Sequence, residues 1–130
     1  MKPQDYLSRY RAAWNAVQSL SRHVQRLQEE CDNLRKRNGE RIRLDAAVAS
    51  LMDAKSEIER ETERMKLVQQ EIISVIERVP SATNRTLLRL VYIEGLSLVD
   101  ASEKMGYSYR NITRIHGHAL QSVWRILSES

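Results

Sequence analysis

Apolar residues recur at every third or fourth position in the first part of the chain. From Asp5 to Arg37 the spacing alternates between four and three over about four heptads, which is typical of a helix with one apolar seam. The seam residues are Tyr6, Tyr10, Ala13, Val17, Leu20, Val24, Leu27, Cys31 and Leu34. We therefore expect one long helix over this segment.

A second segment, from Ile42 to Val79, repeats the same rhythm less strictly. Its seam includes the polar residues Lys55, Thr62 and Gln69, so the apolar stripe is looser than the first one. The remaining seam residues are Leu44, Val48, Leu51, Ile58, Met65, Ile72, Ile76 and Val79. This pattern predicts a second long helix.

The two predicted helices are separated by Asn38-Gly39, a dipeptide that favours a helix end because both residues tolerate the left-handed conformation. A short connection favours antiparallel neighbours. If the chain folds back here, Leu34 faces Leu44, Cys31 faces Val48 and Tyr6 faces Ile72, so the two seams stay in step. We therefore predict an antiparallel coiled-coil hairpin. A parallel coiled coil between two chains is the alternative.

Charge supports the hairpin. Residues 1–43 carry ten Lys or Arg against five Asp or Glu, whereas residues 44–79 carry five against eight. A basic helix would thus lie along an acidic one, and such flanking pairs set orientation more than they add stability. In this geometry Tyr6, Tyr10 and Trp14 would lie beside the start of the C-terminal part of the chain.

The pattern changes after Pro80, where three shorter helices are expected. Ser81 or Thr83 caps the first, which Gly95 ends, and Ser97 and Gly106 bound the second. Ser108 caps the third. Its core positions are Ile112, Ile115, Ala119, Leu120 and Val123. We therefore divide the chain into a helical hairpin, residues 1–79, and a three-helix domain, residues 80–130.

The second and third of these helices have the spacing of a helix-turn-helix. Ala101 is small where the two helices would approach, Gly106 supplies the sharp turn, and Ile112 and Ile115 anchor the second helix so that its first turns project outward. From Gly106 to Leu127 there are three arginines and no acidic residue, which suits a phosphate-lined groove.

The run Leu96-Ser97-Leu98-Val99-Asp100-Ala101-Ser102-Glu103-Lys104-Met105-Gly106-Tyr107-Ser108, followed by Ile112, Arg114-Ile115 and Ala119-Leu120, resembles region 4 of bacterial sigma-70 factors. Together with Tyr92-Ile93-Glu94-Gly95-Leu96-Ser97 and Arg114-Ile115-His116 it is more similar to small phage and prophage transcriptional regulators of the ArpU and RinA type. The resemblance covers about 45 residues. It implies a sequence-specific regulator that reads double-stranded DNA with the helix starting near Ser108.

The resemblance also implies which residues touch DNA. The positions that reach bases and phosphates fall on Tyr109, Arg110, Asn111, Thr113, Arg114 and His118. We add Ser97, Lys104 and Arg125 as candidates for contact with the DNA backbone. Ser108, at the start of the helix, is also placed among the DNA-binding residues. Sigma factors usually carry an Arg-Glu pair and a Gln on this surface, so a different target sequence is expected. The other sigma regions are absent from the sequence, which argues against a complete sigma factor.

The same segment contains residues for which we expect a structural role or exclude a metal-binding one. Tyr107 occupies the usually apolar turn position and is expected in the core. Gly117 lies inside a predicted helix, where glycine costs roughly 1 kcal/mol relative to alanine, so we expect another helix to pack closely against it. His116 and His118 fall on different helix faces, which is the wrong spacing for joint zinc ligation.

Composition narrows the class of protein further. The 130 residues are 29% charged, with 21 Lys and Arg against 17 Asp and Glu, and the single cysteine excludes an internal disulfide framework. No apolar run has the length of a membrane span, and the N-terminus lacks the apolar region of a signal peptide, so a cytoplasmic protein is expected. We find no phosphate-binding glycine loop, nucleophile elbow or His-Glu metal motif, and therefore expect neither an enzyme nor a cofactor.

The expected partners are double-stranded DNA, RNA polymerase and a second copy of the chain, with a dimer favoured because one unit of this size buries little surface on DNA. Two alternatives stay open. The protein could be a phage small terminase subunit that binds DNA for packaging, or a module that binds polymerase or a sigma factor without touching DNA.

Overall fold

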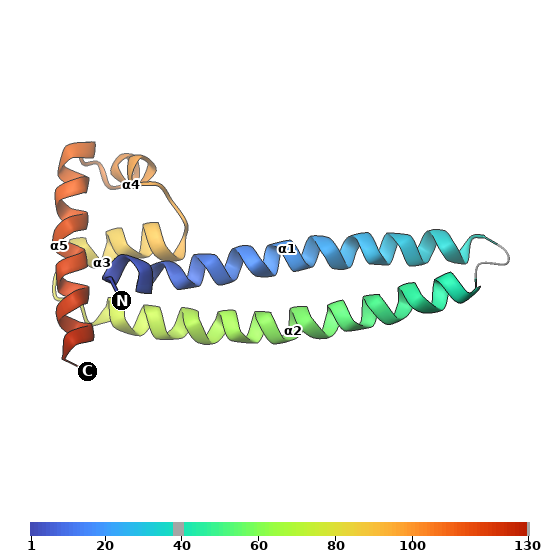
Figure 1. Ribbon diagram of the computed structural model, residues 1–130. Helices are drawn as coiled ribbons and strands as arrows, with labels where there is room; N and C mark the ends of the chain where they lie inside the picture. The colour runs from blue at the N-terminus through green and yellow to red at the C-terminus, as the bar shows by residue number, and fades with distance from the viewer. Residues whose placement is uncertain (38–40, 130) are drawn as a thin grey trace. The chain divides into compact units, whose positions relative to one another are not determined.

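The computed structural model describes residues 1–37 and 41–129, and within these ranges the protein is all-α, without strands (Figure 1). The helices are α1 (Pro3–Arg35), α2 (Arg41–Glu77), α3 (Ala82–Leu88), the π-helix η1 (Arg89–Ile93), α4 (Leu98–Met105) and α5 (Tyr109–Ser128). The predicted fold class is therefore confirmed. Among these helices none is both long enough and apolar enough to cross a lipid bilayer.

The chain forms two compact units. The hairpin unit is Ala13–Met65, and the discontinuous unit combines Met1–Ala12 with Lys66–Ser130. The domain boundary expected between residues 79 and 80 stays a prediction, since both of its sides belong to the discontinuous unit.

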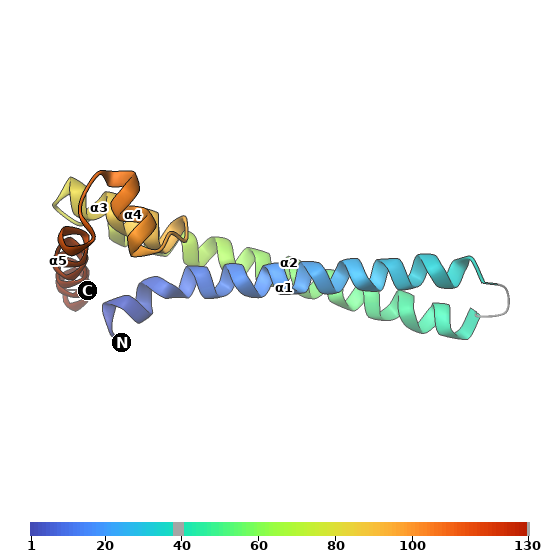
Figure 2. The same ribbon diagram turned by 90° about the horizontal axis from the view of Figure 1, so that it is seen from above.

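The hairpin unit pairs the later part of α1 with the earlier part of α2, as Figures 1 and 2 show from two directions. One apolar cluster contains Cys31 and Leu34 from α1 together with Ala47 and Leu51 from α2, and Val24, Leu27, Leu44 and Val48 pack against it. These are the residues that the predicted antiparallel register brings together, so the hairpin is confirmed. The expected helix stop at Asn38-Gly39 lies outside the described residues.

The buried seam departs from the predicted one at several positions, two of which show the pattern. In α2, Lys55 is exposed and Ala54 is buried instead, with 5% of its surface accessible. In α1, Tyr6 is half-buried, whereas Leu7, which the predicted seam omits, is fully buried. The charge of Lys55 is costly to bury without a partner, so the small neighbour Ala54 packs in its place.

The N-terminal residues of α1 belong structurally to the discontinuous unit. Tyr10 is buried there, as the fold-back geometry predicts, whereas Trp14 lies in the hairpin unit. Arg9 forms an ion pair with Glu71 of α2, and its guanidinium carbon lies 4.6 Å from the centroid of the Tyr6 ring. The first turns of α1 are thus tied to the end of α2.

Beyond α2, the chain enters α3 through a side-chain cap. The Ser81 hydroxyl accepts a hydrogen bond from the Asn84 backbone N–H at 3.2 Å. The helix predicted to run on to Gly95 does so in a different form, because it widens into η1, where the Glu94 N–H donates to the Arg89 carbonyl at 2.9 Å. The turn that follows needs Gly95, whose φ is +80°.

Arg11 of α1 contacts this turn. Its Nη1 lies 3.5 Å from the carbonyl oxygen of Ile93, to which it donates. Its guanidinium covers Gly95 so closely that a Cβ built there would lie 2.6 Å from the Arg11 Cζ. Residues 1–12 therefore contact the segment that leads into α4.

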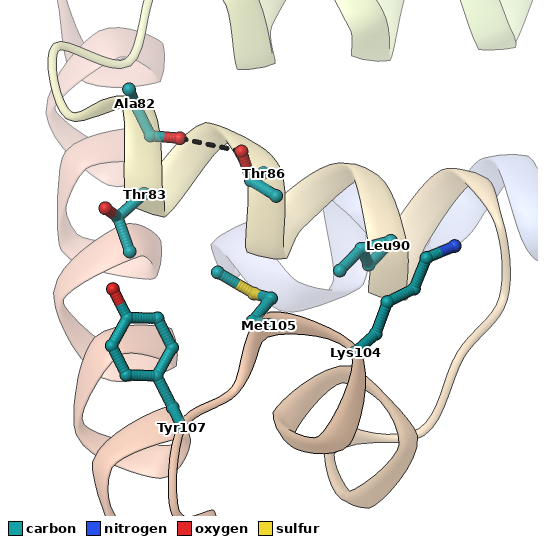
Figure 3. Close-up of a pocket in the computed structure, with 7 residues that line it drawn as sticks. All are labelled: Ala82, Thr83, Thr86, Leu90, Lys104, Met105 and Tyr107. Carbon is teal, nitrogen blue, oxygen red and sulfur yellow. Dashed lines mark hydrogen bonds between the residues drawn. The ribbon is translucent and has the colours of Figure 1, made fainter.

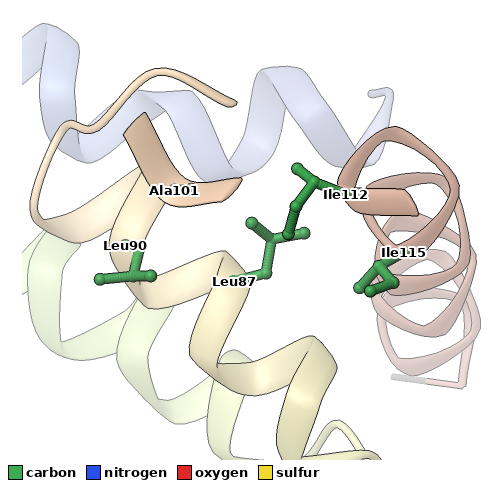
Figure 4. Close-up of a cluster of buried hydrophobic side chains, with 5 residues drawn as sticks. All are labelled: Leu87, Leu90, Ala101, Ile112 and Ile115. Atoms are coloured by element: carbon green, nitrogen blue, oxygen red, sulfur yellow. The ribbon is translucent and has the colours of Figure 1, made fainter. Parts of the chain in front are cut away.

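The four helical elements after Pro80 share one core (Figure 4). Leu87, Leu90, Ala101, Ile112 and Ile115 form a buried cluster to which α3, η1, α4 and α5 all contribute. Figure 2 shows α4 and α5 beside α3. The roles predicted for Ala101, Ile112 and Ile115 in holding the two helices together are confirmed.

Candidate nucleic-acid interface

The start of α5 is fixed by two local devices. Gly106 ends α4 in the left-handed conformation, with φ +75°, and the Ser108 hydroxyl accepts a hydrogen bond from the Asn111 N–H at 3.2 Å. The first turn of α5 is therefore held in one direction, and its backbone N–H groups form the positive end of the helix dipole.

Four of the predicted site residues gather at this helix start. Ser108, Arg110, Asn111 and Arg114 line one open hollow of about 430 Å³. Both arginines are exposed, and Arg114 Nη2 donates a hydrogen bond to Asn111 Oδ1 at 2.7 Å. The hollow therefore presents two guanidinium groups with no acidic side chain in its lining.

Four other predicted residues lie on α5 outside the lining of this hollow. Tyr109 is 55% exposed, and its carbonyl accepts a hydrogen bond from the Thr113 hydroxyl at 3.0 Å. Thr113, His118 and Arg125 are exposed. These residues add to the accessible surface of α5, but they do not line the hollow.

Lys104 lies at a different hollow, of about 450 Å³, between α3 and the end of α4 (Figure 3). Its Nζ is 3.8 Å from Glu94 Oε1, so its charge is partly matched within the chain. The Ser97 hydroxyl accepts a hydrogen bond from the Asp100 N–H at 3.1 Å and thereby caps α4, as predicted.

The core assignment of Tyr107 is wrong. Its side chain is 39% exposed and stands at the edge of the hollow in Figure 3, with Thr83, Thr86, Leu90 and Met105 also in the lining. The core cluster is formed by Leu87, Leu90, Ala101, Ile112 and Ile115, with Val91, Leu96, Leu98 and Met105 packed against it, and Tyr107 is not among them.

The close helix packing expected at Gly117 is also wrong. Apart from the local backbone of α5 and the two adjacent residues, a Cβ built on this residue would meet no described atom within 4 Å, and Gly117 is exposed. Nothing in the described part of the chain therefore fills the position that this glycine leaves open.

The match with a known family follows the same segments. A family model described as "Protein of unknown function (DUF1492)" matches residues 28–123. The chain belongs to the DUF1492 family. The matched range contains the end of α1, all of α2 to α4, and α5 as far as Val123. No curated protein and no solved structure gives a significant match.

This DUF1492 protein also contains a polar contact between Tyr92 and His116 that the sequence did not predict. The Tyr92 hydroxyl lies 2.7 Å from His116 Nε2, and the two rings stack with centroids 5.9 Å apart. Burial raises the pKa of Tyr92 to about 12 and lowers the pKa of His116. The pair links η1 to α5. Its partners are 24 residues apart, so no local spacing pointed to it.

The His116 contact predicts a pH dependence of stability. An unfolded histidine titrates near pH 6.5, and the folded His116 pKa is lower, so below about pH 6.5 the unfolded chain binds more protons. The free energy of unfolding should therefore fall as the pH is lowered through this value and stop falling below the folded pKa. Urea titrations at several pH values measure this change in the free energy of unfolding. In His116→Asn this part of the dependence should disappear, and an unchanged dependence in that variant would contradict the assignment.

Metal binding finds no support in the residues that can be described. Within 1–37 and 41–129, no three His, Cys, Asp or Glu side chains are grouped as metal ligands. Cys31 is fully buried in the hairpin cluster and has the apolar role that its seam position predicts.

Proposed function

We propose that this DUF1492 protein is a sequence-specific, DNA-binding transcriptional regulator of phage or prophage type. Its α5 would lie in the major groove. The observation that carries the proposal is the hollow at the start of α5, where Arg110, Asn111 and Arg114 converge on an accessible surface. Arginine recognises guanine and asparagine recognises adenine by paired hydrogen bonds to base edges in that groove.

Charge around the hollow supports a polyanionic partner. Arg110, Arg114 and Arg125 all belong to α5, and the sequence from Gly106 to Leu127 contains no acidic residue. Neutralising phosphates releases condensed counterions, which gives such a surface general affinity for nucleic acid. Base contacts from the helix then supply the selectivity.

The arrangement of α4 and α5 supports the same reading. In a helix-turn-helix the first helix crosses the DNA backbone while the second enters the groove. Lys104 at the end of α4 would contact a phosphate in place of Glu94, from which its Nζ is separated by 3.8 Å. The Ser97 hydroxyl already caps α4. Its place at the start of this helix would still let Ser97 contact the DNA backbone. The resemblance to sigma region 4 adds RNA polymerase as a further partner.

One such unit contacts few base pairs, so we expect a dimer that reads two half-sites. Light scattering of the free protein measures this directly. A ring of eight or more subunits would instead indicate the packaging role of a small terminase subunit.

Selection from a pool of random duplex DNA tests the proposed function. The full-length protein should enrich a shared sequence, and fluorescence anisotropy should show binding to the enriched duplex at least about 1,000-fold tighter than to the unselected pool. Affinity for both should fall steeply with salt concentration. Failure to retain any duplex at low salt would reject DNA binding, and equal affinity for enriched and unselected duplexes would reject sequence-specific regulation.

A further inference from the structure

Gly117 has no explanation within the described chain. It lies in the interior of α5, where glycine is the least favourable residue after proline. Its φ is not positive, unlike those of Gly95 and Gly106, so an L-residue would adopt the same backbone without strain. A Cβ there would meet nothing within 4 Å. Neither backbone conformation nor internal packing calls for glycine at this position.

The face of α5 that Gly117 occupies is the face of the two arginines. Arg110, Thr113, Arg114 and Gly117 stand at positions i, i+3, i+4 and i+7, which fall on one side of a helix. All four are exposed. A recognition helix contacts base edges from positions with this spacing. Gly117 therefore stands at the place of a contact residue but carries no side chain.

We propose that DNA approaches the backbone of α5 at Gly117, and that the missing side chain sets how deeply the helix lies in the major groove. This inference rests on the proposed function. A helix with its side chains is about 10–12 Å wide and the major groove about 12 Å wide, so one side chain on the contacting face changes the depth of the helix. With glycine there, Arg110 and Arg114 reach the base edges on the same side.

A second copy of the chain is the competing occupant of this face. Trp124, seven residues after Gly117 on the same side of α5, is 58% exposed and has the size to fill the space above the glycine of a partner. Charge disfavours this pairing, because two copies joined through the face would bring their arginines together with no acidic residue on α5 to match them. DNA phosphates match those arginines directly.

The test compares Gly117→Ala and Gly117→Leu with the unchanged protein, using a labelled duplex enriched from a random pool. Gly117→Ala should raise the folding equilibrium constant about fivefold, because alanine is favoured in helices, yet weaken binding to the duplex about tenfold, the loss of one modest base contact. Gly117→Leu should weaken binding further. Gln121→Ala, an exposed change on the same face one turn later, is the matched control and should bind within about twofold of the unchanged protein.

The outcomes separate this inference from the proposed function. If the unchanged protein enriches no duplex, both are overturned. If it binds an enriched duplex and Gly117→Leu binds it equally well, or Gln121→Ala loses as much as Gly117→Ala, only the role of Gly117 is overturned. If Gly117→Leu lowers the molar mass found by light scattering without DNA, a second copy occupies the face and the inference is likewise overturned.

Discussion

Replacing Leu7 with alanine is expected to lower the free energy of unfolding by about 2–5 kcal/mol, the usual range for a fully buried leucine. Leu7, near the start of α1, has no accessible surface. Residues 1–12 belong to the discontinuous unit, where Arg9 pairs with Glu71 and Arg11 donates to Ile93. A cavity at Leu7 would therefore weaken the unit that carries α5. Urea denaturation followed by circular dichroism measures the loss.

Leu67→Ala is the matched control, because Leu67 belongs to the same unit but is 59% exposed. This change should alter the free energy of unfolding by no more than about 0.5 kcal/mol. Equal losses in the two variants, or a negligible loss for Leu7→Ala, would mean that the first turns of α1 do not hold the unit together.

Replacing both Arg110 and Arg114 with alanine is expected to abolish selective DNA binding. Each bidentate contact to a base contributes about 1–3 kcal/mol of discrimination, so the double variant should lose about 2–6 kcal/mol, at least about 30-fold in affinity for an enriched duplex. Both side chains are exposed, so the fold should be retained. Anisotropy titrations against enriched and unselected duplexes measure the loss of selectivity.

Arg22→Ala with Arg26→Ala supplies a control of equal charge. These two exposed arginines stand four residues apart on α1, as Arg110 and Arg114 do on α5, but belong to the hairpin unit. The control should lower affinity for both duplexes slightly and alike, through the change in net charge. If it costs as much selectivity as the α5 double variant, then base reading by α5 is wrong.

The helical architecture could be predicted because local signals agree with the packing. The seam through Cys31 and Leu34 fixes the hairpin register, and Ser97 and Ser108 cap α4 and α5 as their positions indicate. The burial of Ala54 in place of Lys55 departs from the strict repeat, because the charged side chain stays in solvent and its small neighbour packs instead.

The features that escaped prediction depend on contacts between distant residues. The π-helical turn of η1 places Tyr92 against His116, and nothing in the spacing of the sequence marks either the turn or the partner. The hydrogen bond from Arg114 to Asn111 is different, because the two lie three positions apart on one helix and side chains at that spacing face each other. That contact could have been found from the sequence.

The candidate site was predicted in position but not in detail. Ser108, Arg110, Asn111 and Arg114 gather as expected, whereas Lys104 lines another hollow and pairs with Glu94. The lack of packing against Gly117 could not be predicted from its neighbours in the sequence, because it depends on which helices pack against α5. The DNA contacts of all these residues stay predictions.

Because the discontinuous unit draws on both ends of the chain, the hairpin is in effect an insertion within it. The first turns of α1 can meet Ile93 only after all of α1 and α2 have been synthesised, so this unit completes its folding after the hairpin can form. For the same reason, a C-terminal fragment starting at Pro80 would lack Leu7, Tyr10 and Arg11, and adding residues 1–12 as a separate peptide would not restore the missing end of α2.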